Sequence, residues 1–262
     1  MSSDAPAAKK LKPTGTPLYS GLDLSKLTFD AKPQGNEIQH ASAKYDGLRL
    51  TFQLEDVNAG SLRVPFGIDD GSKFGGKASM KIELPEDQRA FFQDGLETKI
   101  KEAAVHNKAT WFSAIKPLPD DATVRASFSS RVHQDDNGNY PPSLKVNVNL
   151  SDDKKQKVTV FTTRRMADYT SHGKITKPIP GSPSDVMRGG SVVPVLRTAG
   201  GVWISANPKK RTFEYGLVFE AVDLLVIEEP AASSAFNLGG VEVAEEETNE
   251  AGDATTFGDA FA

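Results

Sequence analysis

The sequence contains no cysteine, and this absence excludes two common ways of stabilising a chain. Disulfide scaffolds and thiolate metal sites both require cysteine, so the composition suits a reducing compartment. The four histidines, His40, His106, His133 and His172, lie far apart and show none of the short spacings of a metal site. No apolar run approaches the ~18 residues that a membrane span needs. We therefore expect a soluble intracellular protein with no metal, no cofactor and no membrane partner.

The sequence also lacks the motifs of the common catalytic sites. No GxSxG, HExxH or Walker phosphate loop is present. Adjacent carboxylates occur at Asp69-Asp70, Asp120-Asp121, Asp135-Asp136 and Asp152-Asp153, but each pair lies in a segment with the composition of an exposed turn. An enzyme needs a nucleophile and a base, or a metal, in a defined arrangement. The sequence therefore predicts a protein that is not an enzyme.

Basic residues are missing from the end of the chain. From Glu228 to Ala262 there are nine acidic residues and no lysine or arginine, which leaves 26 acids and 31 bases in residues 1–227. A body with a charge of about +5 therefore precedes a tail with a charge of about −9. A basic body attracts polyanions, and a tethered acidic tail competes with them for the same surface.

Composition divides the chain into three regions. Residues 1–20 are proline-rich and basic, and residues 230–262 are acidic with few branched apolar side chains, so both are predicted to be disordered. Residues 21–229 contain enough apolar side chains for one core and form the predicted domain. In the leader, Lys9-Lys10-Leu11-Lys12 matches a short nuclear-import signal as well as it matches a solubilising segment.

The predicted domain is rich in segments that alternate apolar and polar residues, the pattern of half-buried strands. These segments cover residues 24–30, 47–56, 77–84, 110–115, 123–132, 143–150 and 157–163. Residues 189–206 predict two more strands, and Pro194 places its strand at an edge or a bulge because proline cannot donate a ladder hydrogen bond. Residues 212–227 (TFEYGLVFEAVDLLVI) are dense in aromatic and branched apolar residues. Segments 66–76, 135–142 and 168–188 have the composition of loops.

One segment has helical periodicity. Pro85 suits a first helical position, and a helix is predicted over about residues 85–106. Its apolar residues recur at spacings of three and four on one face: Phe92, Leu96, Ile100 and Ala103. Many strands and one helix predict a mainly β domain, a partly open β-barrel with the helix packed on it as a plug. A sandwich is the alternative architecture.

Basic and aromatic side chains are interleaved in several predicted strands and turns. Proteins that bind single strands without reading their sequence use this mixture, because cations bind phosphates while aromatic faces stack on bases. Trp203 suits a stacking platform and a core position equally, whereas Phe128 and Phe219 are predicted core residues. The candidate DNA-binding residues are Arg125, Arg131, Lys145, Phe161, Arg164, Arg165, Trp203, Lys209, Lys210 and Arg211.

An ordered set of features in residues 77–229 carries a resemblance to a known family. The set consists of paired strands at 143–150 and 157–163, then Gly189-Gly190-Ser191, Trp203, and Tyr215-Gly216-Leu217 leading into EAVDLLVIEE and an acidic tail. With these features the chain resembles the single-stranded DNA-binding proteins of T-seven-like phages and their counterparts in large nucleocytoplasmic DNA viruses. The resemblance implies an OB-fold with an inserted helix, a non-catalytic role in viral DNA replication and recombination, and Trp203 beside the DNA.

The resemblance also implies a role for the tail. The tail would occupy the DNA groove when DNA is absent, and would contact replication proteins such as a DNA polymerase or a helicase/primase. The candidate partner-binding residues are Glu245, Glu246, Glu247, Phe257 and Phe261. The predicted partners are therefore single-stranded DNA and replication proteins, and a homodimer is left open. The alternative function is structural, a β-sandwich such as a virion component in which the separated charges serve assembly.

Overall fold

The computed structural model describes residues 16–35, 38–56, 60–72, 77–135, 137–151, 157–164 and 177–228. They belong to one compact unit, Met1–Pro230, and a second unit, Ala231–Ala262, lies outside the described residues. The predictions for the tail, those for most of the leader, and the candidate Arg165 fall outside them as well. Within the described residues no helix is both long enough and apolar enough to cross a membrane.

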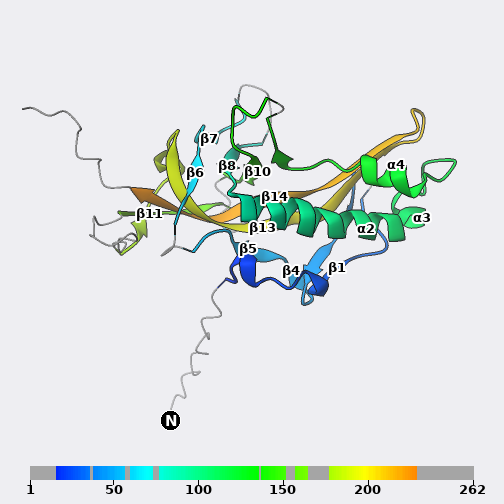
Figure 1. The fold of residues 1–262 in the computed structure, drawn as a ribbon, viewed down its shortest axis with the longest axis horizontal. Helices are drawn as coiled ribbons and strands as arrows, with labels where there is room; N and C mark the ends of the chain where they lie inside the picture. The colour runs from blue at the N-terminus through cyan, green and yellow to red at the C-terminus, as the bar shows by residue number, and fades with distance from the viewer. Residues whose placement is uncertain are drawn as a thin grey trace, which may run out of the picture. The chain divides into compact units, whose positions relative to one another are not determined.

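The main sheet is organised around a long hairpin at the end of the described chain (Figure 1). Its strands are β13 (Gly190–Asn207) and β14 (Thr212–Glu228), which pair antiparallel over their whole length. The first half of β14 directs alternate residues into the core: Phe213, Tyr215, Leu217 and Phe219. The strand β14 therefore forms from the stretch that is densest in aromatic and branched side chains, the residue types that favour a half-buried strand.

The segment for which two strands were predicted, residues 189–206, forms the single strand β13. Its register with β14 shifts twice, and the first shift follows Pro194 by one residue, as expected beside a residue that cannot donate a ladder hydrogen bond. The second shift contains Gly200 and Gly201, whose φ angles of 77° and 98° favour glycine. A Cβ on Gly201 would lie 2.2 Å from the backbone oxygen of Ala41, so no larger residue fits there.

The other strands add to both edges of this hairpin. The order of the main sheet is β12-β11-β14-β10-β8-β7, with β9 beside β10. β10 and β11 both pair parallel with β14, and β2, β5 and β6 pair antiparallel with β13. A separate sheet has the order β1-β3-β4. The bounds are β1 Leu27–Phe29, β2 Ile38–Ala41, β3 Ala43–Tyr45, β4 Leu48–Arg49, β5 Thr51–Gln53, β6 Leu62–Val64, β7 Ile68–Asp69, β8 Ser79–Glu83, β9 Val132–His133, β10 Ser143–Val148, β11 Thr159–Arg164 and β12 Ile179–Pro180.

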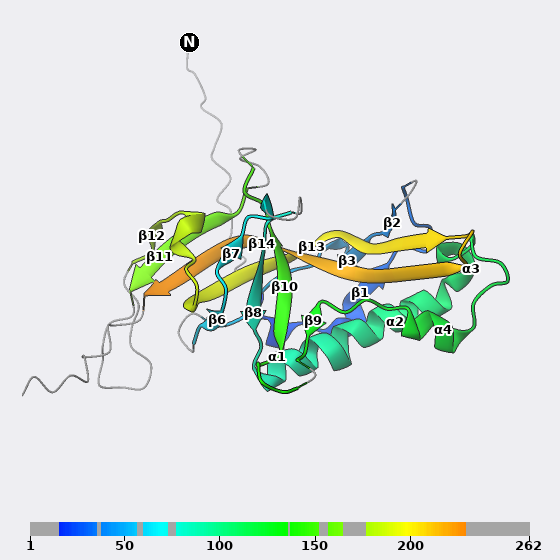
Figure 2. The same ribbon diagram turned by 90° about the horizontal axis from the view of Figure 1, so that it is seen from above.

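The predicted helix is present and packs on the core-facing side of the sheet (Figure 2). It consists of α1 (Glu86–Ala90), a π-helical stretch (Phe91–Glu97) and α2 (Thr98–His106), with Pro85 directly before its first residue. Phe92 on the helix contacts Phe52 of β5 and Phe219 of β14, with ring centroids 6.2 and 5.3 Å apart. Phe219 is thus a core residue, as predicted.

Two predicted strands are wrong. Segment 110–115 begins within the short helix α3 (Lys108–Trp111) and continues as a turn. Segment 123–132 begins within the helix α4 (Asp121–Ala126), continues as irregular chain and ends at the first residue of β9. The Asp120 side chain caps α4 by accepting a 2.7 Å hydrogen bond from the N–H of Thr123, which gives this segment a helical start that alternation does not reveal. Single 3-10 turns occur at Tyr19–Gly21, Leu24–Lys26 and Pro183–Asp185.

The predicted pairing of segments 143–150 and 157–163 is also wrong. β10 and β11 follow one another along the same edge of β14 instead of pairing with each other. The mainly β class with one long helix is confirmed, and the sheets stay open and do not close into a barrel. The helix therefore covers a sheet and does not plug a barrel.

Candidate nucleic-acid interface

Strands β8, β10 and β9 present side chains in rows across the face of the sheet that points away from the core. In β8 the residues Met80 and Ile82 are buried, so Lys81 and Glu83 lie on the outer face. Lys81 is directly opposite Lys145 of β10, and Glu83 is directly opposite Ser143. Register partners in a sheet share a face, so each pair begins a row that can be followed onto the next strand.

The first row consists of three cations, Lys81, Lys145 and Arg131, which we call the cation row. Continuing the β9–β10 register by one residue places Arg131 opposite Lys145, and the backbone N–H of Lys145 donates a 3.0 Å hydrogen bond to the carbonyl of Arg131. None of the three forms an ion pair with another described residue. Like charges directly opposite each other destabilise a sheet, so this arrangement favours an anion from outside the chain.

Arg131 is the most enclosed member of the cation row. It is half-buried, and its Nε has no hydrogen-bond partner among the described residues. Burial lowers the pKa of its guanidinium, because the charged form loses hydration without gaining a carboxylate. A phosphate oxygen bound by the terminal guanidinium nitrogens of Arg131 would neutralise this charge, whereas the Nε itself is buried.

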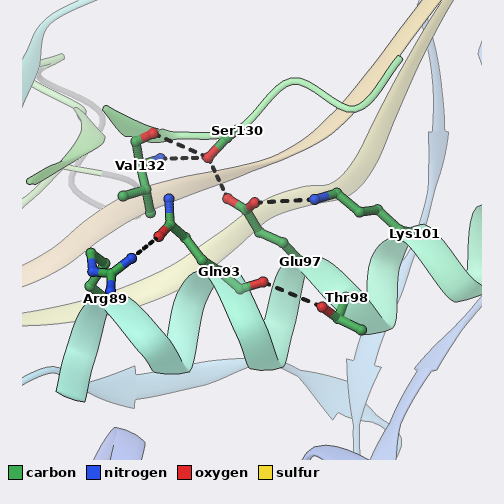
Figure 3. Close-up of polar contacts among 7 residues, drawn as sticks. All are labelled: Arg89, Gln93, Glu97, Thr98, Lys101, Ser130 and Val132. Atoms are coloured by element: carbon green, nitrogen blue, oxygen red, sulfur yellow. Dashed lines mark hydrogen bonds and ion pairs between the residues drawn. The ribbon is translucent and has the colours of Figure 1, made fainter. Parts of the chain in front are cut away.

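The segment that carries Arg131 is anchored to the helix by a buried carboxylate (Figure 3). The hydroxyl of Ser130 donates a hydrogen bond to Glu97, and the same hydroxyl accepts a 3.0 Å hydrogen bond from the N–H of Val132. Lys101 Nζ lies 3.8 Å from the second oxygen of Glu97. These contacts hold the residues on both sides of Arg131, and thereby fix where its backbone meets β10.

Glu97 gives a test of this anchor through pH. Its side chain is only 8% exposed, and burial raises the pKa of its carboxyl above the ordinary 4.5. The folded state therefore holds this proton to a higher pH than the unfolded state. Its contribution to stability is fully present below pH 4.5 and is lost as the pH rises through the folded-state pKa. Glu97→Gln, measured by urea unfolding between pH 4.5 and 7, should show a free energy of unfolding that falls less with rising pH than that of the unsubstituted protein.

The exposed Glu102→Gln is the matched control, because Glu102 lies on the same helix and pairs with Lys99 in solvent. It should leave the pH profile unchanged. Parallel profiles for Glu97→Gln and the unsubstituted protein would show that Glu97 titrates as an ordinary surface carboxylate.

The second row forms the floor of a groove. It consists of Glu83 of β8, Ser143 of β10 and His133 of β9, which are register partners. One wall is Pro65-Phe66 after β6 and the other is Tyr140-Pro141 before β10, and together with Lys81 and Asp135 these residues enclose about 340 Å³. A second hollow adjoins it and adds Arg63 and Arg188 to the lining.

The groove displays two aromatic side chains that the core does not use. Phe66 is 57% exposed and Tyr140 is 69% exposed. Lys81 Nζ lies 5.9 Å from the centroid of the Phe66 ring. The groove therefore adjoins the cation row, since Lys81–Lys145 is the next pair on the same face after Glu83–Ser143. Exposed aromatic rings beside unpaired cations are the combination that binds single-stranded nucleic acid.

Two acids on this face, Glu83 and Glu220, pair with arginines and not with the lysines of the cation row. Arg63 lies 3.4 Å from Glu83, and Arg197 lies 2.9 Å from Glu220. On the helix, the cations Arg89 and Lys99 each pair with a nearby glutamate. The cation row therefore differs from the cations of the helix. It also differs from other unpaired cations of the described residues, such as Arg49 and Arg125, because its three members are direct neighbours on adjacent strands. No group of His, Asp or Glu side chains within the described ranges is arranged to bind a metal ion.

The structure brings together two of the candidate residues, Arg131 and Lys145, in the cation row. Trp203 lies on the same outer face. Its β14 partner is Gly216, and Gly216 is four residues from Glu220, which is the partner of Asn147 in β10. Residues an even number apart along a strand share a face. Four residues of strand span about 13 Å. Trp203 is half-buried, and a Cβ on Gly216 would lie 3.1 Å from its Nε1, so the ring lies over this glycine.

The remaining candidates lie at the two ends of the hairpin. Lys209, Lys210 and Arg211 form its exposed turn, which is eight residues, or roughly 26 Å, from Glu220 along β14. Arg125 is exposed on α4 and not on a strand. Phe161 and Arg164 are on β11, beside the far end of β14. Phe128 is only partly buried, between Tyr215 and Lys101.

Sequence reasoning missed Phe66, Tyr140 and Lys81. Phe66 and Tyr140 each lie in a segment rich in Gly, Asn, Asp or Pro, where a large aromatic side chain has no strand or helix to pack on. That mismatch is a usable signal for an exposed ring. Lys81 carries no such signal, because only the register of β8 with β10 shows that it faces Lys145.

No family model and no curated protein matches the chain. Among solved structures, the single-stranded DNA-binding protein from bacteriophage Enc34 is similar, with a TM-score of 0.37 and 11% identity over 82% of this chain and 96% of that one. Its C-terminal truncation gives a TM-score of 0.33 and 11% identity over 79% and 97%. Both are described as phage single-stranded DNA-binding proteins. The grouping of this chain with T-seven-like phages and large nucleocytoplasmic DNA viruses stays a prediction.

Proposed function

We propose that the protein binds single-stranded DNA without catalysis. The observation that supports this most directly is the cation row, Lys81, Lys145 and Arg131, whose charges have no acidic partner among the described residues and lie beside two exposed aromatic rings. Phosphates would neutralise the row, and bases would stack on Phe66 and Tyr140. In a duplex the base faces are stacked on one another, so such rings can stack only on an unpaired strand.

The other candidate residues extend this site along the outer face. Trp203 would stack on a base next to the cation row, and the hairpin turn Lys209–Arg211 would hold phosphates beyond it. The two ends of a long bound DNA strand would be contacted by Arg125 on α4 and by Phe161 and Arg164 on β11. In this proposal the central row and groove supply most of the affinity, and the outer residues add contacts only when the bound strand is long enough.

The experiment is a titration of a labelled oligo-dT, and of a duplex of equal length, followed by fluorescence anisotropy at several salt concentrations. The single strand should bind more tightly than the duplex. Its log K should fall linearly with log salt concentration, with a slope of roughly −0.7 per neutralised phosphate. Equal affinity for the duplex, or an affinity that ignores salt, would contradict the proposal.

The acidic tail is proposed to compete with the DNA and to recruit replication proteins when DNA displaces it. The proposal is supported by the nine acids and the absence of bases from Glu228 onward. A flexible polyanion tethered to a basic surface acts at an effective concentration on the order of millimolar. In viral replication or recombination, the displaced tail would be free for a polymerase or helicase/primase.

Deleting residues 231–262 should therefore tighten binding of oligo-dT at low salt. The gain should shrink as salt rises, because screening shortens the range of the competing charges. The melting temperature should stay nearly constant, since the core residues lie before Glu228. An unchanged or weaker affinity at low salt would show that the tail does not compete for the DNA surface.

A further inference from the structure

We propose, resting on the proposed function, that the groove between Phe66 and Tyr140 holds one base of the strand and selects bases that carry an exocyclic amino group over thymine. The selecting group is the carboxylate of Glu83 at its floor. The protein would then read one position of a strand that it otherwise holds through phosphates and stacking.

The groove is built for one flat ring beside a phosphate. Its walls come from two separate loops, Pro65-Phe66 and Tyr140-Pro141, so a base can stack on aromatic or proline rings from either side. The volume of about 340 Å³ is at the lower end of the range for small-ligand sites. The cation row lies one residue pair from the floor row, or about 7 Å along the strands, so a nucleotide can reach both.

The floor of the groove contains a charged acceptor with free capacity. Glu83 is 19% exposed, and its Oε1 accepts a 3.4 Å hydrogen bond from Arg63, which leaves Oε2 without a hydrogen-bond partner among the described residues. The other carboxylate of the lining, Asp135, accepts a 2.8 Å hydrogen bond from the N–H of Asn139 within its own turn. Each of the two carboxylates thus keeps one oxygen without a hydrogen-bond partner among the described residues. Glu83 lies in the floor row on β8, whereas Asp135 lies in the turn after β9, so we assign Glu83 as the acceptor that faces a ligand.

A carboxylate distinguishes amino groups from carbonyl oxygens. It accepts from the 4-amino group of cytosine, and in the same way from the amino groups of adenine and guanine. Thymine presents a carbonyl oxygen at that position, and its one edge donor, N3–H, is flanked by two carbonyl oxygens that repel a carboxylate. The 4-amino group of cytosine has only C5–H on its outer side, so it is the better donor to Glu83. A single charge-assisted hydrogen bond of this kind corresponds to a preference of about tenfold.

The test compares oligo-dC, oligo-dU and oligo-dT of equal length at pH 8, where cytosine is neutral. The unsubstituted protein should bind oligo-dC about tenfold more tightly than the other two, because one hydrogen bond to a charged group separates them. Oligo-dU separates the effect of the amino group from that of the thymine methyl. Glu83→Gln should bring the dC to dT ratio close to one, since an amide can donate to a carbonyl as well as accept from an amine.

Removing any acid strengthens binding to all polyanions, so the ratio is the readout. Glu214→Gln is the matched control, because Glu214 is exposed on the outer face of β14 away from the groove and its loss changes the charge equally. It should keep the dC preference. Similar dC and dT affinities in the unsubstituted protein, or a dC preference that survives Glu83→Gln, would overturn this inference while leaving single-strand binding intact. A protein that binds none of the three oligomers would overturn the proposed function itself.

Discussion

Replacing Lys81 and Lys145 together by glutamine should weaken single-strand binding and stabilise the fold at the same time. At 0.1 M salt each phosphate contact contributes about fivefold to affinity, so losing two should reduce it about 25-fold and make the salt slope shallower by roughly 1.4. The two lysines are directly opposite each other without an acidic partner among the described residues, so their removal should raise the free energy of unfolding by about 0.2–1 kcal/mol. Anisotropy titrations and urea unfolding measure the two effects.

Weaker DNA binding together with a higher free energy of unfolding distinguishes this variant from one that loses affinity because it unfolds. Lys99→Gln is the control, because Lys99 is equally charged but pairs with Glu102 on the exposed side of the helix. It should change neither the salt slope nor the stability by much. If the double variant at Lys81 and Lys145 binds oligo-dT like the unsubstituted protein, the phosphates lie elsewhere on the surface and the cation row is not the site.

Replacing Phe66 and Tyr140 together by alanine should weaken binding by about 1–3 kcal/mol, the contribution of the one base that the groove between them holds. The salt slope should stay the same, because no phosphate contact is lost. Both side chains are more than half exposed, so the melting temperature should change little. Anisotropy titrations at two salt concentrations and thermal unfolding measure these effects.

Leu48→Ala provides the matched control, because Leu48 is 74% exposed on β4 of the separate small sheet. Its loss removes exposed apolar surface without touching the groove, and it should leave the affinity unchanged. A shallower salt slope in the Phe66 and Tyr140 variant would mean that these rings position a phosphate contact and do not stack on bases.

Helices and strands that depend on residues close together in the sequence can be predicted from it. The helix at 86–106 follows from the spacing of Phe92, Leu96 and Ile100, and the strand β14 follows from one dense apolar stretch. The strand prediction for segment 123–132 is wrong, because the Asp120 side chain caps a helix there although the residues alternate as in a strand. Local patterns are sufficient when one periodicity dominates, and they fail when a capping side chain competes with it.

The site is harder to predict because it depends on register. Lys81 and Lys145 are far apart in the sequence, and only the pairing of β8 with β10 makes them neighbours. Arg131 joins them through a short strand that was predicted as part of a longer one. Single candidates such as Lys145 can be recognised from charge and alternation, whereas a row of cations exists only after the strands have paired.

The place of β14 in the chain has a consequence for biosynthesis. This strand supplies the edge on which β10 and β11 pair, and it is the last strand of the described chain to leave the ribosome. The main sheet therefore cannot be completed until Glu228 has been synthesised. The β13–β14 hairpin is local, but the pairing of β14 with β10 and β11, and of β13 with β2, β5 and β6, closes long loops and slows folding. Until then the strands β8 and β10 expose apolar faces and open edges, which are the features that favour aggregation of a nascent chain.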